Sequence, residues 1–338
     1  MNIKKIFAGI MAVCVIGGVM PSVDMVSDNA VITANAEDYT EGKYESLTYK
    51  NYGDHIEISG CDKSATEVVI PAEIEGLPVA SIGDSAFNGC KTLTSTVIPD
   101  SITSIGKSAF WQCEKLTSVN IQENITIIDN GVFYSCKSLE SITIPDGVTS
   151  IGNFAFEGCE SLTSIIIPNG VTSIGNSAFD NCNSLTSITI PDSVTEIASY
   201  AFKRCKSLES ITIPDGVTII NEETFSNCNN MTSVTLPESL KKIGLNAFSA
   251  CVGLTSITIP DSVTDIESGA FGRCETLTSI IIPESVKKIG STAFAYCADL
   301  TSITIMNPEC EISDTSSTIS NGYDDDNKNH YYNGTIYG

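Results

Sequence analysis

Residues 139–161 read LESITIPDGVTSIGNFAFEGCES, and copies of this 23-residue unit fill most of the 338-residue chain. Ten cysteines lie at equal intervals of 23 residues, and ten phenylalanines keep the same interval three positions earlier. The cysteines are Cys90, Cys113, Cys136, Cys159, Cys182, Cys205, Cys228, Cys251, Cys274 and Cys297. A fixed period of this length indicates one short unit stacked on copies of itself, and such stacks mostly present surfaces and seldom build catalytic pockets.

The unit itself contains signals for two strands and a compact turn. Residues 141–144 alternate Ser or Thr with Ile, which is the period of two that a half-buried strand requires. Pro145 ends this strand because proline cannot donate a hydrogen bond to the ladder. Residues 148–151 indicate a second short strand, and we expect residues 153–159 to form a single turn of helix that buries Phe156.

The pattern Leu-x-x-Ile-x-Ile-Pro-x-x-Val-x-x-Ile-Gly-x-x-Ala-Phe-x-x-Cys resembles the bacterial leucine-rich-repeat group called BspA-like, from about Glu67 to Ile312. The resemblance implies a curved solenoid and a secreted or surface-exposed bacterial protein that binds other molecules, often as an adhesin. The group has no shared catalytic residues to transfer. The expected fold is a β-rich repeat solenoid, a right-handed leucine-rich-repeat superhelix with short strands and single helical turns, capped at both ends.

The sequence divides into four expected segments. Lys4 and Lys5, the apolar run 6–20 and the small-x-small site 34–36 predict a secretory signal peptide. The apolar run is too short to span a bilayer, so we expect no membrane insertion of the mature chain. The segments are a signal peptide at 1–36, a β-rich N-terminal cap at 37–66, about ten solenoid coils at 67–312 and a polar C-terminal cap at 313–338. The last cap ends abruptly at Gly338, which leaves its completeness open.

The chain is strongly acidic, with a formal net charge of −23. Removal of residues 1–36 takes away two basic and two acidic residues, so this charge is unchanged. Such a surface repels phosphate backbones and anionic lipids, and we therefore expect no nucleic-acid partner. The charge has two explanations that stay open: solubility of a long stack, or attraction of a cationic partner.

The cysteine ladder is the first candidate for chemistry. Stacked side chains point in parallel, which is poor geometry for disulfides, and zinc would need His and Cys converging four at a time. Only two histidines are present, His55 and His330. We expect buried, reduced thiols that fill space and bond the turn backbone, with disulfides or metal as the alternative. Cys61 and Cys310 lie outside the ladder and are expected to be too far apart to pair. We expect no cofactor, no metal and no enzymatic activity.

Two surfaces are candidate partner-binding sites. The first is a polar ladder on the outward side of the first strand, where β-propensity and solubility are the alternative explanation. Its members are Ser141, Thr143, Ser187, Thr189, Ser210, Thr212, Thr235 and Thr258. The second is an aromatic pair, Trp111 and Tyr134, which occupy the same position in consecutive units and should be neighbours. Exposed aromatic pairs favour protein hot spots or sugar stacking, and chance variation is the alternative.

These observations support a secreted or cell-surface binding protein without enzymatic activity. We expect it to mediate adhesion or protein–protein interaction through the solenoid surface, with a host or bacterial surface protein as its ligand. The alternative is a non-catalytic binder of extracellular polysaccharide, or an accessory or scaffold module of an extracellular enzyme system. A purely structural spacer is a third hypothesis.

Overall fold

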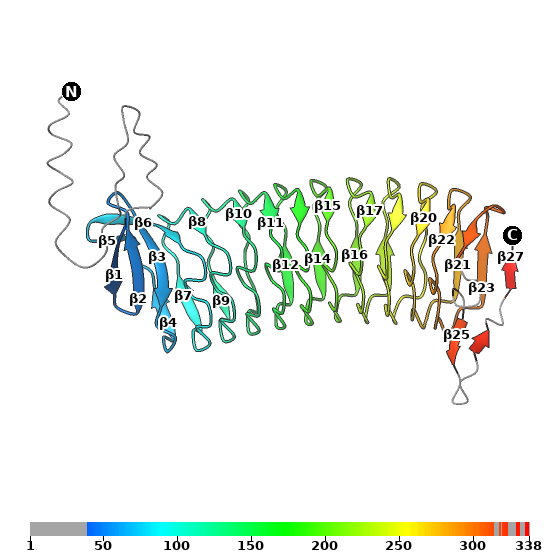
Figure 1. Cartoon of the computed structure of the whole chain (residues 1–338), viewed down its shortest axis with the longest axis horizontal. Coiled ribbons are helices and arrows are strands. Elements are labelled where there is room, and N and C mark those ends of the chain that lie inside the picture. Colours follow the sequence, from blue (N-terminus) through cyan, green and yellow to red (C-terminus); the bar gives the residue numbers. More distant parts are fainter. Residues whose placement is uncertain (1–38, 314–317, 319, 324–328, 332–334, 338) are drawn as a thin grey trace, which may run out of the picture. The chain divides into compact units, whose positions relative to one another are not determined.

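The computed structural model describes residues 39–313, 318, 320–323, 329–331 and 335–337, and the repeats form a continuous stack of windings (Figure 1). The signal peptide expected at 1–36 lies outside the described residues. No helix among the described residues is long and apolar enough to cross a bilayer. The stack of windings with short strands confirms the expected β-solenoid, while the handedness of its superhelix stays a prediction.

Most windings, a winding being one repeat-long turn of the stack, contribute strands to two ladders. The first ladder contains β4 (Glu67–Val69), β7 (Ser95–Val97), β9 (Ser118–Val119), β12 (Ser164–Ile166), β14 (Ser187–Thr189), β16 (Ser210–Thr212), β18 (Ser233–Thr235), β21 (Ser279–Ile282) and β23 (Ser302–Ile305). The second contains β6 (Leu77–Ile82), β8 (Ser104–Ile105), β10 (Ile127–Ile128), β11 (Ser150–Ile151), β13 (Ser173–Ile174), β15 (Glu196–Ile197), β17 (Ile219–Ile220), β19 (Lys242–Ile243), β20 (Asp265–Ile266), β22 (Lys288–Ile289) and β24 (Glu311–Ile312). Within the repeats, neighbouring strands pair in parallel with partners one full repeat apart, as Ile151 does with Ile174.

The first ladder is less regular than the sequence predicts. In the winding of residues 139–161, the strand expected over 141–144 is reduced to one isolated bridge between Asn120 and Thr143. Residues 255–259 contain no strand. The second ladder has longer unbroken sheets, β10-β11-β13-β15 and β17-β19-β20-β22-β24, although most of its strands have only two residues.

The predicted turn of helix over residues 153–159 is wrong. These residues form consecutive hydrogen-bonded turns in which Phe154 and Gly158 have φ of 59° and 73°. The phase of a residue is its position within the 23-residue repeat. All ten residues at the phase of Phe154, and all ten at the phase of Gly158, have positive φ. Such residues interrupt a right-handed helix, because a left-handed residue cannot continue its hydrogen-bond pattern. The freed amides bond the next winding instead, as Phe156 N does to Ala178 O at 2.8 Å.

The core is one apolar column along the stack. The ten phenylalanines from Phe87 to Phe294 are at most 1% exposed. Their rings lie 4.9–5.6 Å from those of the adjacent windings, within 14° of parallel. The apolar positions of the repeat pattern, occupied by Leu, Ile, Val, Ala and Cys, supply most of the other buried side chains. Because each ring touches the rings before and after it, burial in one winding depends on both neighbours.

The cysteine ladder consists of free thiols, as expected. Nine of them, from Cys113 to Cys297, donate a hydrogen bond of 3.1–3.3 Å to the phenylalanine carbonyl of the preceding winding. That carbonyl also accepts a bond from the cysteine amide of its own winding, as Phe87 O does from Cys90 N at 3.0 Å. The thiols therefore use the second lone pair of carbonyls inside the turns.

Additional strands lie before and after the repeats. In the N-terminal part, β1 (Thr40–Tyr44), β2 (Leu47–Asn51) and β3 (Ile56–Cys61) pair in antiparallel fashion, and β3 pairs in parallel with β6. The insertion in the first winding forms a hairpin of β5 (Glu73–Ile74) with β6. In the C-terminal part, β25 (Ser320–Tyr323) pairs with β26 (Asn329–Tyr331), and β27 (Thr335–Tyr337) extends the first ladder beside β23.

One packing defect in the first ladder gives a test of the core. Thr96 is 5% exposed and its hydroxyl has no hydrogen-bond partner, whereas the other nine repeats have Val or Ile at this position. Thr96→Val should raise the free energy of unfolding by about 1–2 kcal/mol, because it removes an unsatisfied buried hydroxyl. Denaturant titration measures this change. Thr189→Val, at an exposed position, is the control and should stay within about 0.5 kcal/mol; an equal effect of both variants would contradict the explanation.

Candidate binding surfaces

The predicted polar ladder lies on one exposed face of the stack. In β14, Ser187 and Thr189 are exposed while the intervening Ile188 is buried, and the same alternation holds in β16. All eight predicted members of this ladder are exposed: Ser141, Thr143, Ser187, Thr189, Ser210, Thr212, Thr235 and Thr258. The structure thus brings them together along the stack, and their role in binding stays a prediction.

Threonines one position earlier bind the stack together and are not free for a partner. The hydroxyl of Thr186 donates to Thr163 O at 3.3 Å, and that of Thr301 donates to Thr278 O at 3.1 Å. These threonine hydroxyls therefore add side-chain hydrogen bonds between windings to the backbone hydrogen bonds. The sequence indicates no role for these threonines, because nothing in the Thr-Ser-x-Thr pattern shows that the first threonine bonds the preceding winding.

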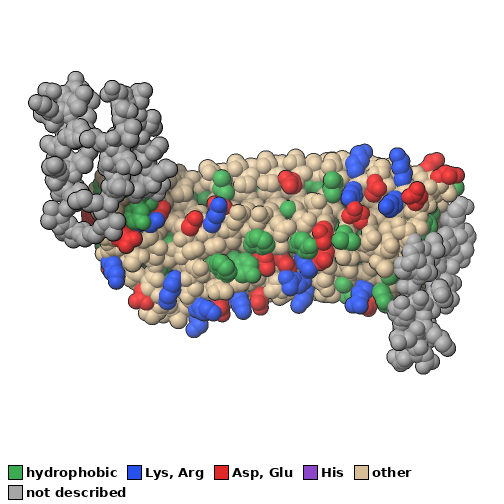
Figure 2. All heavy atoms as spheres, viewed as in Figure 1, with side chains coloured by type: hydrophobic (Ala, Val, Ile, Leu, Met, Phe, Trp, Pro, Cys, Tyr) green, Lys and Arg blue, Asp and Glu red, His purple; other side chains and the backbone are tan. Residues whose placement is uncertain are grey.

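The polar face also contains exposed apolar side chains that sequence reasoning did not select. Val97, Ile166 and Ile281 occupy the place that Thr189 has in its winding, and Ile166 is 78% exposed. The sequence could have indicated them, because they are apolar residues at a position of the repeat that points outward. The face is therefore mixed in character, with hydroxyl groups interrupted by aliphatic ones. Over the surface seen in Figure 2, hydrophobic side chains likewise form small separate patches among polar groups.

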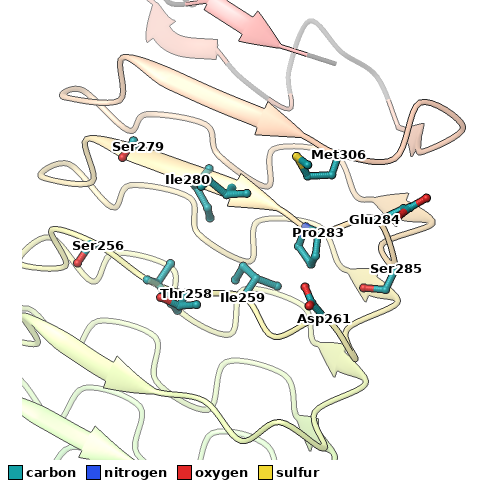
Figure 3. A pocket seen from close by; sticks show the side chains of 12 residues that line it. Ser256, Thr258, Ile259, Asp261, Ser279, Ile280, Pro283, Glu284, Ser285 and Met306 are labelled. Atoms are coloured by element: carbon teal, nitrogen blue, oxygen red, sulfur yellow. The ribbon is translucent and has the colours of Figure 1, made fainter.

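A hollow of about 880 Å³ lies on this face near the C-terminal end of the repeats (Figure 3). Its lining includes the hydroxyls of Ser256, Thr258 and Ser279 and the apolar side chains of Ile281 and Met306. The carboxylates of two corner residues complete one side: Asp261 and Glu284. Hydroxyls, carboxylates and aliphatic groups together suit a ligand that has both polar and apolar faces.

The predicted aromatic neighbours are in contact. The rings of Trp111 and Tyr134 lie 5.4 Å apart at 74°, an edge-to-face arrangement, and Trp111 is 38% exposed. Phe154, on the next winding, is 41% exposed. It occupies a left-handed position of the turn, which is uncommon for an aromatic residue. Three aromatic side chains from consecutive windings thus lie at one place on the surface.

These side chains border a hollow of about 440 Å³ above Gly131. Gly131 has the phase of Phe154 in the preceding winding, so the side chain that would fill this space is absent. Lys107 and Glu157 lie at the edges of the same hollow. The hollow could not be predicted from the aromatic pair alone, because it depends on one glycine in one winding.

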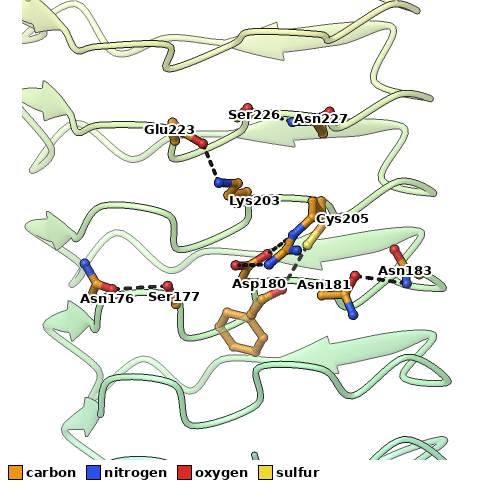
Figure 4. A network of polar contacts seen from close by, with 12 residues as sticks. Asn176, Ser177, Asp180, Asn181, Asn183, Lys203, Cys205, Glu223, Ser226 and Asn227 are labelled. Atoms are coloured by element: carbon orange, nitrogen blue, oxygen red, sulfur yellow. Dashed lines mark hydrogen bonds and ion pairs between the residues drawn. The ribbon is translucent and has the colours of Figure 1, made fainter. Parts of the chain in front are cut away.

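The electrostatics beside the hollow are unusual for this acidic chain. Burial raises the pKa of the Glu157 carboxyl, and the charge of Asp180 raises it further, while Arg204 and a hydrogen bond from Tyr134 lower it. Arg204 donates hydrogen bonds of 2.9 Å and 2.7 Å to the two carboxylate oxygens of Asp180. Asp180 belongs to the polar network drawn in Figure 4. Glu157 therefore carries a partly desolvated carboxylate with no ion-pair partner among the described residues.

Two other aromatic side chains at outward positions, Tyr200 and Tyr296, have cationic partners. The Lys203 ammonium lies 5.1 Å from the ring centroid of Tyr200, and the Arg273 guanidinium lies 5.4 Å from that of Tyr296. Within the described part of the chain, no cation lies over the rings of the aromatic hollow. This difference makes the hollow the place where aromatic faces and a carboxylate are available to a cation from another molecule.

The described residues contain no group of three or more His, Cys, Asp or Glu side chains placed to hold a metal ion. His55 lies away from both surfaces, with Nδ1 at 2.6 Å from the Asp54 carboxylate and its ring stacked on Tyr52. His330 is in β26, and its side chain is outside what the structure describes.

The state of Glu157 gives a pH-dependent prediction. A carboxyl whose pKa is raised on folding destabilises the folded state above that pKa, and this cost disappears as the pH falls below the unfolded value. Glu157→Gln should therefore raise the free energy of unfolding at pH 7 by about 0.5–1 kcal/mol, a small figure because the side chain is only half buried. The gain should vanish near pH 4. Glu140→Gln, at an exposed position in the same winding, is the control, and a gain that is independent of pH would contradict the assignment.

Comparisons with known proteins identify the repeat family. The model of the BspA type leucine rich repeat region matches residues 80–209 and 195–317. A search of the curated proteins found no match. Similar solved structures include the Treponema pallidum leucine-rich-repeat protein (31% identity, 64% of this chain, 91% of that chain, TM-score 0.45) and a leucine-rich-repeat protein of Bacteroides ovatus (25%, 86%, 99%, 0.39). A leucine-rich cell surface protein of Faecalibacterium prausnitzii is 27% identical, with 79% and 95% coverage and a TM-score of 0.40. The chain belongs to the BspA-type leucine-rich-repeat family.

Proposed function

We propose that this chain is an exported, non-enzymatic protein of the bacterial surface that binds another protein, in adhesion or in a protein–protein assembly. Family membership supports a binding role, because stacked repeats act through extended surfaces. The predicted signal peptide at 1–36 supports export. The BspA-type repeats supply the scaffold, and the side chains at outward positions supply the specificity.

The observation that carries the proposal is the aromatic hollow, meaning the surface formed by Trp111, Gly131, Tyr134, Phe154 and Glu157. Aromatic side chains that are partly exposed and rigidly held are typical anchors of protein interfaces. Here three of them come from consecutive windings whose backbones are fixed by stacking. The surface is therefore formed before a partner arrives, which lowers the entropic cost of binding.

The charges define the chemistry of the partner. The chain has a net charge of −23, and the hollow combines aromatic faces with the carboxylate of Glu157. A Lys or Arg side chain entering the hollow would meet the ring faces and the carboxylate together. Long-range attraction by the acidic surface would speed the approach of a basic protein segment. The ligand we propose is accordingly a protein with a basic, exposed segment.

The double variant Trp111→Ala plus Tyr134→Ala should reduce affinity for the captured protein at least tenfold, because it removes two of the three aromatic anchors of the hollow. The purified chain is first used to capture ligands from host matrix and bacterial surface proteins, and affinity for the captured protein is then measured by surface plasmon resonance. Tyr200→Ala plus Tyr296→Ala removes one partly exposed and one exposed aromatic side chain elsewhere and should leave affinity unchanged. Equal losses in both double variants would contradict a specific role of the hollow.

A second candidate function is the binding of extracellular polysaccharide, alone or as an accessory module of an extracellular enzyme system. The hollow of about 880 Å³ favours it, since hydroxyls and carboxylates at the edge of an aliphatic surface can match the polar and apolar faces of a sugar. Aromatic stacking by Trp111 would serve the same ligand class.

Two matched variants on the polar ladder distinguish these functions. Thr258 lines the 880 Å³ hollow and Thr212 lies two windings away at the same phase. If the chain binds glycans, Thr258→Arg should abolish binding on a glycan array by filling the hollow, and Thr212→Arg should not. If instead both variants weaken capture of the protein ligand and no glycan is bound, the polar face belongs to the protein interface and the polysaccharide function is excluded.

A further inference from the structure

The two ends of the cysteine ladder differ in what their thiols can bond. From Cys113 onward, each thiol has the phenylalanine carbonyl of the preceding winding as its acceptor, at 3.1–3.3 Å. Burial raises the pKa of these thiols, as in Cys136 and Cys182, where it is the largest cause. A buried thiol that stays protonated and hydrogen bonded is chemically inert.

Cys90 is the first member of the cysteine ladder, and no winding before its own supplies a phenylalanine carbonyl. Its nearest carbonyl acceptor is that of Cys61, and the distance from Cys90 Sγ to Cys61 O is 4.0 Å, which is longer than any of the nine ladder bonds. Cys61 ends strand β3, outside the repeats. The Cys61 thiol donates a hydrogen bond of 3.5 Å to Asp62 O, and the interaction of the two neighbouring thiols raises the pKa of Cys61 and lowers that of Cys90. Two cysteines whose separation does not match the repeat therefore meet where the N-terminal strands contact the first winding.

Lys63 adds a positive charge to this pair. Its ammonium lies 3.8 Å from Cys90 Sγ and donates a hydrogen bond to Asn88 O. The loop that carries Lys63 is fixed to the first winding, because the hydroxyl of Thr92 donates to Lys63 O at 3.0 Å. The neighbouring Cys61 thiol is the largest cause that lowers the pKa of Cys90 to about 7, and the Lys63 ammonium lowers it further. This shift favours the thiolate, the form of cysteine that reacts.

The pair can be reached from solvent at one side. Cys61 is 8% exposed and lines a hollow of about 370 Å³ together with Lys63, Ser59 and Ala86. Cys90 is fully buried behind it. This arrangement puts one cysteine at the surface of the hollow and a second one directly beneath.

We propose that Cys61 and Cys90 form a reversible disulfide that links the N-terminal strands to the first winding, with a small-molecule or protein disulfide as the oxidant. In the first step, Cys61 loses its proton to solvent and attacks one sulfur of the oxidant, whose S–S bond breaks and releases a thiolate. The Cys90 thiolate then attacks Cys61 Sγ in the mixed disulfide, which expels the second thiolate. Counted from two thiols, the cysteines lose two electrons and two protons; the oxidant takes up the two electrons and becomes two thiolates, which solvent protonates according to the pH.

The linkage would close a loop between two parts of the chain that have no common repeat. Strand β3 joins the stack through its pairing with β6, and the disulfide would add a covalent connection to the turn at Cys90. A crosslink of this kind restricts the unfolded chain and so favours the folded state. The disulfide would oppose local opening of the first winding, because the end of a stack is its least supported part.

The test is oxidation of the purified full chain by oxidised glutathione at pH 7, followed by alkylation, proteolysis and mass spectrometry. The expected product is a peptide pair joined through Cys61 and Cys90 with loss of two hydrogens, formed at least tenfold faster than any modification of the nine ladder thiols. The thermal unfolding midpoint should rise on oxidation and fall back on reduction. Failure to find this linkage, or equal reaction of the ladder thiols, would overturn the proposal.

Three variants separate the chemistry from effects on folding. Cys61→Ser should abolish the linked peptide and the oxidation-dependent rise of the unfolding midpoint, while Cys182→Ser, inside the ladder, should change neither. Lys63→Gln, at an exposed position, should slow oxidation at least threefold at pH 7 and shift the midpoint of its pH–rate profile upward. An unchanged profile in Lys63→Gln would refute the role of the ammonium, and linkage that persists in Cys61→Ser would refute the assignment of the pair.

Discussion

The structure depends on one constraint: each residue of the repeats lies beside its equivalent in the next repeat. The parallel pairing of Ile151 with Ile174, the stacking of Phe179 on Phe202 and the bond from the Cys205 thiol to Phe179 O all need this register. A slip of one residue would move inward side chains to the surface in every winding that follows. Inward positions are therefore nearly invariant along the chain, and variation is confined to outward ones.

This confinement explains where binding surfaces can arise. An outward residue costs the stack little when it changes, so differences between windings accumulate there without loss of the core. The aromatic hollow exists because Gly131 omits a side chain between windings that carry larger groups, and Trp111 and Tyr134 stand beside it. The thiol pair at the N-terminal end follows from the same constraint, since no earlier winding supplies a phenylalanine carbonyl and Cys90 Sγ lies 4.0 Å from Cys61 O instead.

Much of this could be predicted from the sequence because the period is strict. The phases of Trp111 and Tyr134 predict their contact, and the phase of Thr189 predicts its exposure. The turn was predicted wrongly, because residues such as Phe154 give no signal of a left-handed conformation. Stacking imposes that conformation on all ten residues at this position of the repeat, whether they are Gly, Ser, Thr, Asn, Glu, Tyr or Phe. The glycine after the second strand has a packing role that the sequence alone does not show, because a Cβ on Gly175 would lie 2.5 Å from the Gly152 carbonyl carbon of the preceding winding.

The sequence by itself determined the solenoid, its inward column and the outward positions of the two candidate surfaces, because a strict period fixes which side chains superimpose. Only the tertiary structure decided what lies between the repeats and what lies at their ends. The hollow above Gly131 needs the shapes of three windings at once, and the meeting of Cys61 with Cys90 does not follow the period. Contacts of this kind leave no trace in the repeat pattern, since they depend on how the chain enters the stack.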